Sequence, residues 1–223
     1  MYEIGSKELG KRVYHHCETC GGIFLDRAYL LSSVDEKNRY EKHDNSLKNA
    51  GYRRYLEDFI SAVLTFPALN EENPENRRKI HDFGSGPEPA LATLLGEKGF
   101  EVHFSDKFFA PLPKMFPGGA DILTCLEVAE HFMDPLGEFA LMASLLRPGG
   151  FLALGTLLLE SGGTYPSIWD FFAPWWYRQD ATHISFYSEK SLRLVAGDAG
   201  FEWQGQAGPH IYLFKKIQEV ARS

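Results

Sequence analysis

The stretch 80-IHDFGSGPEPALATLLGEKGFEVHFSDK-107 decides the fold, because it holds a strand, a helix and a second strand in succession. Residues 80–83 predict a short strand, residues 90–98 a helix and residues 101–104 the next strand. Gly84 and Gly86 follow the first strand, where the backbone must turn tightly into the helix. A unit of this kind indicates two parallel strands joined by a crossover helix.

The rest of the chain continues the alternation. An amphipathic helix is expected from Tyr52 to near Pro67. Later strands are expected at 122–126, 151–157, 201–204 and 211–214, and later helices at 136–146 and 189–199. The predicted fold class is α/β, a Rossmann-like doubly wound, mainly parallel sheet of six or seven strands. The 14 residues between Asp106 and Asp121 are rich in proline, so a full helix and third strand hardly fit there.

The chain divides into three expected parts. Residues 1–48 are polar and without a sustained period, and we interpret them as a small N-terminal appendage in which 35-DEKNRYEKHDNS-46 is a solvated charged stretch. Residues 49–77 supply a linking helix, and residues 78–223 form the main domain.

Composition excludes several classes of function. With 23 Lys and Arg against 30 Asp and Glu, the formal charge is −7, which disfavours a nucleic-acid partner. No apolar run reaches the ~18 residues of a membrane span. The first residues lack a secretory signal, and three cysteines make no disulfide framework, so we expect a cytoplasmic protein.

The glycine turn is a candidate cofactor site, since doubly wound sheets bind ligands beyond the carboxyl ends of their strands. Pro89 stands where a dinucleotide fingerprint needs its third glycine, which disfavours a nicotinamide-dependent oxidoreductase. Asp106 ends the second strand, 24 residues after Asp82, where a carboxylate can accept both hydroxyls of a ribose. The alternatives are an ordinary strand-to-helix turn for the glycines and a helix N-cap for Asp106.

Four segments together resemble the class I S-adenosylmethionine (SAM) dependent methyltransferases. These segments are 82-DFGSGPE-88, Asp106, 121-DILTCLEVAEHFMDP-135 and 147-RPGG-150, within about residues 78–215. The N-terminal segment around Cys17 and Cys20 also resembles the leader of one bacterial subgroup. The resemblance implies that SAM is held by Asp82, Gly84, Ser85, Gly86, Asp106, Cys125, Leu126 and Glu127. Glu88 replaces the family's third glycine, which places a carboxylate near the cationic end of SAM.

Catalytic candidates lie beyond the strand ends. The segment 165-YPSIWDFFAPWWYRQDATHISFY-187 has nine aromatic residues and is expected to form a lid or acceptor pocket over the cofactor. Within it, Asp180 is placed to orient His183 as a general base, and His131 is a further candidate beside Glu130. The alternatives are that the aromatics are core, that Asp180 caps a loop and His183 is hydrogen-bonded scaffolding, and that Glu130 and His131 are satisfied by backbone groups at a helix start.

The pair Cys17 and Cys20, followed by Gly21, has the form of a zinc knuckle. A zinc site needs four ligands, and His15, His16 or His43 are the candidates to complete it. We favour a metal-free pair, with zinc as the alternative.

These features predict a SAM-dependent methyltransferase acting on a small-molecule acceptor. The alternative is a catalytically silent binding or regulatory module that keeps the SAM fold, which Glu88 and the shortened third-strand region suggest.

Overall fold

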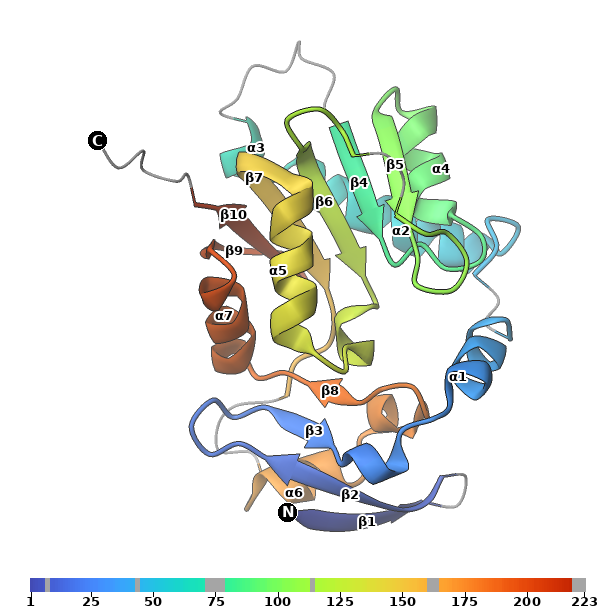
Figure 1. Cartoon of the computed structure of the whole chain (residues 1–223), viewed down its shortest axis with the longest axis vertical. Coiled ribbons are helices and arrows are strands. Elements are labelled where there is room, and N and C mark those ends of the chain that lie inside the picture. Colours follow the sequence, from blue (N-terminus) through green and yellow to red (C-terminus); the bar gives the residue numbers. More distant parts are fainter. Residues whose placement is uncertain (7–8, 43–44, 71–78, 113–114, 160–164, 218–223) are drawn as a thin grey trace.

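The fold is described here from a computed structural model of the chain, for residues 1–6, 9–42, 45–70, 79–112, 115–159 and 165–217. Its main element is a six-stranded sheet in the order β5-β4-β6-β7-β10-β9 (Figure 1). The strands are β5 (Glu101–Ser105), β4 (Lys79–Phe83), β6 (Ala120–Leu126), β7 (Leu146–Gly155), β10 (Ile211–Lys216) and β9 (Phe201–Gly208). The first four are parallel, and β10 runs antiparallel to both of its neighbours.

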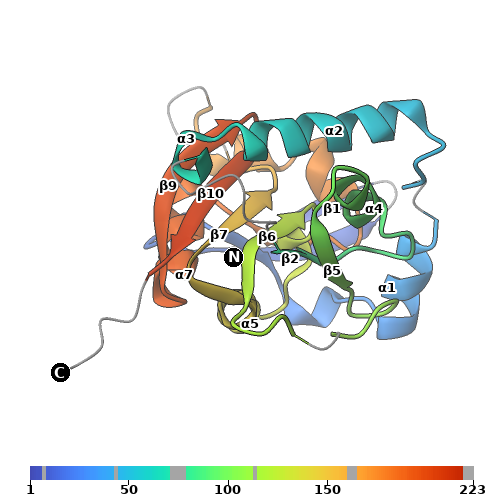
Figure 2. The same ribbon diagram turned by 90° about the horizontal axis from the view of Figure 1, so that it is seen from above.

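Helices cover both faces of this sheet, as Figure 2 shows from above. The helices α2 (Ala50–Leu64) and α4 (Ala90–Glu97) pack on one face, and α5 (Pro135–Leu145) and α7 (Glu189–Asp198) on the other. Strand β6 shows the alternation that this requires, because Ile122 is buried with α2 and α4 whereas Leu123 and Cys125 are buried with α5 and α7. The Rossmann-like α/β fold is therefore confirmed. A short helix, α3 (Pro67–Asn70), follows α2.

The expected shortage of one strand is also found. Between β5 and β6, residues 107–112 and 115–119 contain no strand, and Asp106 forms only an isolated bridge with Ala110. Strand β5 is consequently the edge of the sheet on this side.

The N-terminal residues form a second sheet, which the sequence analysis did not predict. Strands β1 (Tyr2–Ser6), β2 (Gly10–His16) and β3 (Ile23–Leu25) join β8 (Ser185–Phe186) in the order β1-β2-β3-β8. Strand β3 pairs with β8 through Ile23 with Phe186 and Phe24 with Ser185. We call this four-stranded sheet the cap sheet. The cap sheet could not be predicted from local sequence patterns, because β3 and β8 are short and lie about 160 residues apart.

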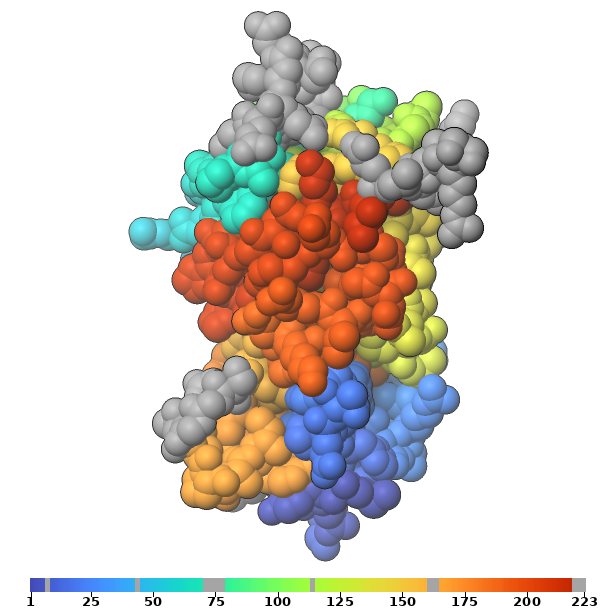
Figure 3. Space-filling view, turned by 90° about the vertical axis from the view of Figure 1, so that its left-hand side faces the viewer, coloured from blue at the N-terminus to red at the C-terminus, as the bar shows by residue number. Residues whose placement is uncertain are grey.

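The cap sheet lies beyond the carboxyl ends of the parallel strands (Figure 1). Three short helices, η1 (Arg27–Tyr29), α6 (Ile168–Phe172) and η3 (Trp176–Gln179), flank it, and α1 (Ser33–Tyr40) leads away from it. Figure 3 shows the N-terminal residues and the segment that begins at residue 165 as adjacent surfaces below α7. No helix among the described residues combines the length and apolar character needed to cross a membrane.

Most of the aromatic residues of the segment 165–187 are core, as the alternative interpretation held. Phe172 and Phe186 are almost completely buried and make edge contacts with each other and with Tyr14 of β2. Trp169 stacks on Tyr2 at a ring distance of 4.6 Å. The aromatic enrichment therefore reflects a second hydrophobic core, which joins the N-terminal strands to residues 157–186, and not a lid over a cofactor.

Tyr14 offers a test of this second core. Its ring is fully buried, and its hydroxyl has no hydrogen-bond partner among the described residues. Tyr14→Phe should leave the free energy of unfolding unchanged or raise it by about 1–2 kcal/mol, since an unpaired buried hydroxyl carries a desolvation cost. Tyr14→Ala should lower it by about 3–5 kcal/mol through the cavity it leaves. Denaturant unfolding of the two variants beside the wild type measures both, and a Tyr14→Ala variant as stable as Tyr14→Phe would contradict the packing role.

Candidate functional site

A cavity of about 650 Å³ opens at the carboxyl edge of the parallel sheet, between this sheet and the helices α1 and α2. Its walls come from the loops after β4, β5 and β6 together with α1 and the start of α2. This is the edge at which doubly wound sheets bind their ligands. The volume falls within the range of about 300–1,000 Å³ that is usual for small-molecule and cofactor sites.

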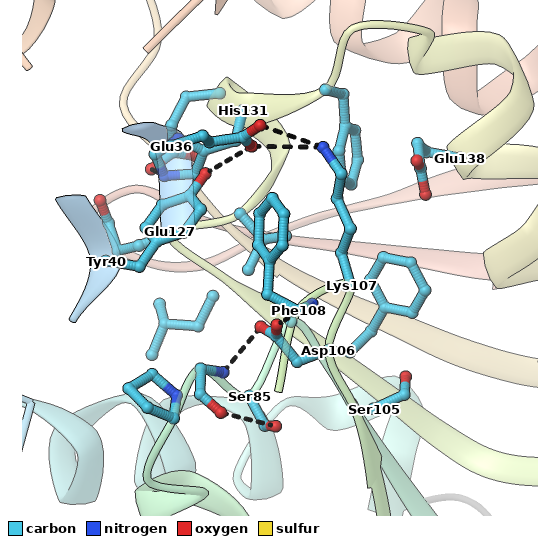
Figure 4. A pocket seen from close by; sticks show the side chains of 18 of the residues that line it. Glu36, Tyr40, Ser85, Ser105, Asp106, Lys107, Phe108, Glu127, His131 and Glu138 are labelled. Carbon is cyan, nitrogen blue, oxygen red and sulfur yellow. Dashed lines mark hydrogen bonds and ion pairs between the residues drawn. The ribbon is translucent and has the colours of Figure 1, made fainter. Parts of the chain in front are cut away.

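The turn after β4 forms one end of the cavity. Gly84 and Gly86 have φ of 79° and 69°, left-handed values that favour glycine. The carboxylate of Asp106 accepts a hydrogen bond from the Gly86 backbone N–H at 3.0 Å, and its other oxygen accepts from Phe108 and Phe109. Asp106 thus ties the turn after β4 to the loop after β5, as Figure 4 shows. Asp106 therefore caps a turn, and the alternative of a helix N-cap is wrong because no helix begins at this residue. Its carboxylate also faces the cavity.

The structure brings most of the predicted site residues to this one cavity. Those lining it are Gly84, Ser85, Gly86, Asp106, Leu126, Glu127, His131 and His183. Asp82 does not line it, because the side chain is buried below the turn and accepts a hydrogen bond from Thr124 at 2.8 Å. Cys125 points into the core on the side of α5 and α7. Glu88 is exposed and is not among the lining residues, which corrects the expectation that it lies at the cofactor.

Several lining residues were missed by the sequence analysis. Glu36 and Tyr40 lie one turn apart on α1, within the stretch that we took for a solvated charged segment, and both face the cavity. Glu36 forms an ion pair with Lys107 at 3.1 Å, which links α1 to the loop after β5 (Figure 4). Tyr52 and Tyr55 of α2 also line the cavity. The only signal in the sequence was the spacing of Glu36 and Tyr40 on one helix face.

Two carboxyl groups lie at the end of the cavity opposite Asp106, of which Glu130 is buried and Glu127 is half-buried. Tyr55 and Tyr177 donate hydrogen bonds to the two oxygens of Glu127 at 3.0 and 3.2 Å. Thr156 donates to Glu130 Oε2 at 3.0 Å. Burial, followed by the proximity of Glu130, raises the pKa of Glu127 to about 8, and burial raises the pKa of Glu130 as well.

Glu127 also has an unusual backbone. Its φ is 53°, which is uncommon for a residue other than glycine, and its N–H donates to the Gly155 carbonyl at 2.8 Å. This conformation turns the chain sharply at the end of β6. Backbone strain of this kind is concentrated at functional sites.

The two histidines predicted to be catalytic lie next to this carboxyl pair. His131 Nδ1 donates to the Thr182 carbonyl at 2.9 Å, and His183 Nδ1 donates to the Tyr177 carbonyl at 2.6 Å. The two imidazole rings make an edge contact at 4.8 Å. The partner of the His183 Nδ1 is therefore a backbone carbonyl, which corrects the expectation that Asp180 orients this ring.

Asp180 has a different task. Its carboxylate accepts hydrogen bonds from the Thr182 backbone N–H and hydroxyl at 2.9 and 2.6 Å, and it pairs with Arg39 of α1 at 2.7 Å. It fixes the loop that carries both Thr182 and His183 and connects this loop to α1. It does not line the cavity.

The cysteine pair lies in the turn between β2 and β3, away from the cavity. Cys17 and Cys20 are half-buried free thiols, and the Cys20 N–H donates to Cys17 Sγ at 3.5 Å. His15 Nε2 lies 2.7 Å from Asp26 Oδ2, and the His16 ring packs edge-on against Trp169. His43 lies outside the described residues. Whether the pair holds zinc stays a prediction.

The raised pKa of Glu127 makes the stability of the protein depend on pH. In the folded state Glu127 keeps its proton up to about pH 8, whereas in the unfolded chain a glutamate releases it near pH 4.5. The folded state therefore binds more protons between these values, and Glu127 makes stability fall as pH rises through this window. Glu127→Gln should flatten the fall in melting temperature between pH 5 and pH 8. Thermal unfolding of both proteins across this range is the measurement, and parallel curves would contradict the assignment.

Comparison with known proteins agrees with this geometry. Residues 51–204 match a family model described as a methyltransferase domain. A ubiquinone biosynthesis O-methyltransferase of Xanthomonas campestris pv. campestris is 41% identical over 61 residues, which is 27% of this chain and 26% of that protein. The corresponding protein of Azotobacter vinelandii is 32% identical over 76 residues, 34% of this chain and 33% of its own. The matched stretch thus spans only a quarter to a third of these relatives.

Among solved structures, the 1,6-didemethyltoxoflavin-N1-methyltransferase of Burkholderia thailandensis has a similar fold. The TM-score is 0.54 at 15% identity, and the alignment covers 92% of this chain and 99% of that one. The family model covers more than two thirds of the chain, including every strand of the parallel part of the sheet. The chain therefore belongs to the methyltransferase domain family.

Proposed function

We propose that this methyltransferase binds SAM across the turn after β4 and transfers its methyl group to a small-molecule acceptor bound at the other end of the same cavity. The observation that carries the proposal is the cavity itself, which has the glycine turn and Asp106 at one end and the cluster of Glu127, Glu130, His131 and His183 at the other. The structure from Burkholderia thailandensis is described as a complex with S-adenosylhomocysteine and 1,6-didemethyltoxoflavin, a small molecule.

The cofactor end suits a nucleoside with an attached amino acid. The Asp106 carboxylate is held by backbone N–H groups, so it is fixed in place to accept hydrogen bonds from two ribose hydroxyls. Gly84 and Gly86 let the backbone approach a ligand closely. Glu127 also lines this cavity, and we infer that its carboxyl group faces the cationic amino-acid portion of SAM where the cofactor extends from Asp106 toward the acceptor end.

The acceptor end suits a compact, partly aromatic molecule. Tyr40, Phe108 and Phe132 supply apolar walls, and His131 and His183 present polar nitrogens to the same space. Methyl transfer from a sulfonium is an in-line displacement, so the chief contributions of the protein are alignment of the reacting atoms and exclusion of water. An acceptor that must lose a proton would lose it at this histidine-containing end.

The two glycines of the turn provide a matched pair for testing the cofactor site. A Cβ on Gly84 would overlap the methyl groups of Val128, whereas a Cβ on Gly86 would meet nothing within 4 Å. Gly84→Ala should push the turn away from Val128 and weaken SAM binding at least tenfold. Gly86→Ala carries only the strain of its positive φ and should lower stability by about 1 kcal/mol with a smaller change in affinity. Calorimetric titration with SAM compares the two, and equal affinities would place SAM elsewhere.

Turnover tests the proposal as a whole. The wild type should convert SAM to S-adenosylhomocysteine with at least one member of a panel of phenols, amines and thiols, detected by mass spectrometry. His183→Ala should reduce kcat by about 10²–10⁴-fold and leave SAM affinity nearly unchanged, because its imidazole lies at the acceptor end.

Trp176→Ala is the control for that variant, because Trp176 belongs to the same segment but is 68% exposed. It should retain turnover. Equal losses in the two variants would show that the segment is structural, and SAM binding without turnover on a broad panel would favour the silent module.

A further inference from the structure

A buried acceptor atom without a partner marks the inner end of the cavity. Glu130 is completely buried, and its Oε1 has no hydrogen-bond partner among the described residues. The other oxygen accepts from Thr156, so only Oε1 is unsatisfied. An unpaired carboxylate oxygen in a buried site is costly unless a cation or a donor faces it.

Two imidazole nitrogens face the same point. His131 Nε2 lies 3.9 Å and His183 Nε2 lies 4.0 Å from Glu130 Oε1. These separations are too long for hydrogen bonds. Because each Nδ1 donates its proton to a backbone carbonyl, each ring in its neutral form presents the Nε2 lone pair. When Glu130 is ionised, the point between the three atoms is therefore surrounded by acceptors.

We propose that Glu130, His131 and His183 bind one divalent transition-metal ion of the zinc type. The three ligand atoms lie within 4.8 Å of one another. Zinc bound at about 2.0–2.2 Å in tetrahedral geometry needs ligand separations of about 3.3–3.6 Å, so small rotations of the side chains complete the site. The hydrogen bonds from each Nδ1 to a carbonyl are the outer contacts that orient metal-binding histidines.

The donor set indicates the kind of ion and its use. Two imidazoles and one carboxylate suit zinc and its neighbours, whereas magnesium prefers oxygen ligands throughout. Three protein ligands leave a fourth position open, and the cluster lines the cavity. An acceptor hydroxyl bound there would lose its proton more readily, since a bound ion lowers the pKa of a coordinated oxygen. This use rests on the proposed function, whereas the binding of the ion does not.

The position of the ion also gives it a structural consequence. Glu130 and His131 belong to the short helix η2 (Ala129–His131) after β6, and His183 precedes β8 of the cap sheet. The ion would therefore connect the main sheet to the cap sheet. Metal binding should raise the melting temperature as well as fill the site, which gives a readout independent of catalysis.

The test uses the whole 223-residue chain made without an affinity tag and carrying Cys17→Ser and Cys20→Ser, so that the thiol pair cannot contribute an ion. After removal of metal with a chelator, the protein is titrated with Zn²⁺ and, separately, with Co²⁺, whose visible absorption reports the coordination. We expect about one ion per chain and a higher melting temperature. His183→Ala and the isosteric Glu130→Gln should each weaken Zn²⁺ binding at least 30-fold. The control His210→Asn, which removes an exposed imidazole and keeps a residue suited to its φ of 59°, should bind as before.

Absence of stoichiometric binding would overturn the proposal, as would equal binding in all variants. Should the cysteine variant not fold, the wild type answers the same question, because Co²⁺ bound to thiolates has a distinct near-ultraviolet absorption. Should the histidine or glutamate variants not fold, broadening by Co²⁺ of the His131 and His183 imidazole resonances of the folded protein decides. Titration of the metal-free protein with S-adenosylhomocysteine separates the proposals, because binding of that ligand without metal binding would sink the metal site alone.

Discussion

The parallel pairing of β5, β4, β6 and β7 is the constraint on which the cavity depends. Parallel strands end at the same edge, so the turn after β4, the carboxylate after β5 and the glutamates after β6 meet there although they are far apart in the sequence. Each of these loops then needs a conformation that leaves the strand abruptly. Gly84, Gly86 and Glu127 have positive φ values because the chain turns sharply at these residues.

A second pairing, between β3 and β8, holds the cap sheet opposite the carboxyl edge of the parallel strands. It joins the N-terminal strands to a segment about 160 residues later and buries Tyr14, Phe172 and Phe186 between them. Because His183 lies two residues before β8, this core positions the imidazole that faces Glu130. Packing in the cap sheet and geometry at the acceptor end are therefore coupled, so a substitution in the cap-sheet core should change the position of His183 at the acceptor end.

The sequence predicts the main sheet well because each of its elements carries a local pattern. Strand 80–83, the glycine turn and helix 90–98 are defined by neighbours in the chain, and the absent third strand follows from the short proline-rich stretch after Asp106. The cap sheet and its contribution to the cavity rest on long-range pairing between short strands, which leaves little local signal. Glu36 and Tyr40 were missed for this reason, since only the placement of α1 turns them toward the cavity. Aromatic enrichment in 165–187 indicated burial, but composition does not distinguish a core from a ligand pocket.

The electrostatics of the acceptor end oppose folding. Glu130 is buried and Glu127 half-buried there beside two histidines, and desolvation lowers the pKa of His131 while raising those of Glu127 and Glu130. Hydrogen bonds from Tyr55, Tyr177 and Thr156 offset part of this cost, yet Glu130 Oε1 has no donor within the part of the chain that the structure describes. A core optimised for stability alone would replace such groups by apolar side chains. The presence of these groups in a cavity that also contains the cofactor turn is best explained by a cation or a reacting group that binds between them. The free energy that keeps the protein folded despite this cost comes from the apolar clusters on both faces of the sheet.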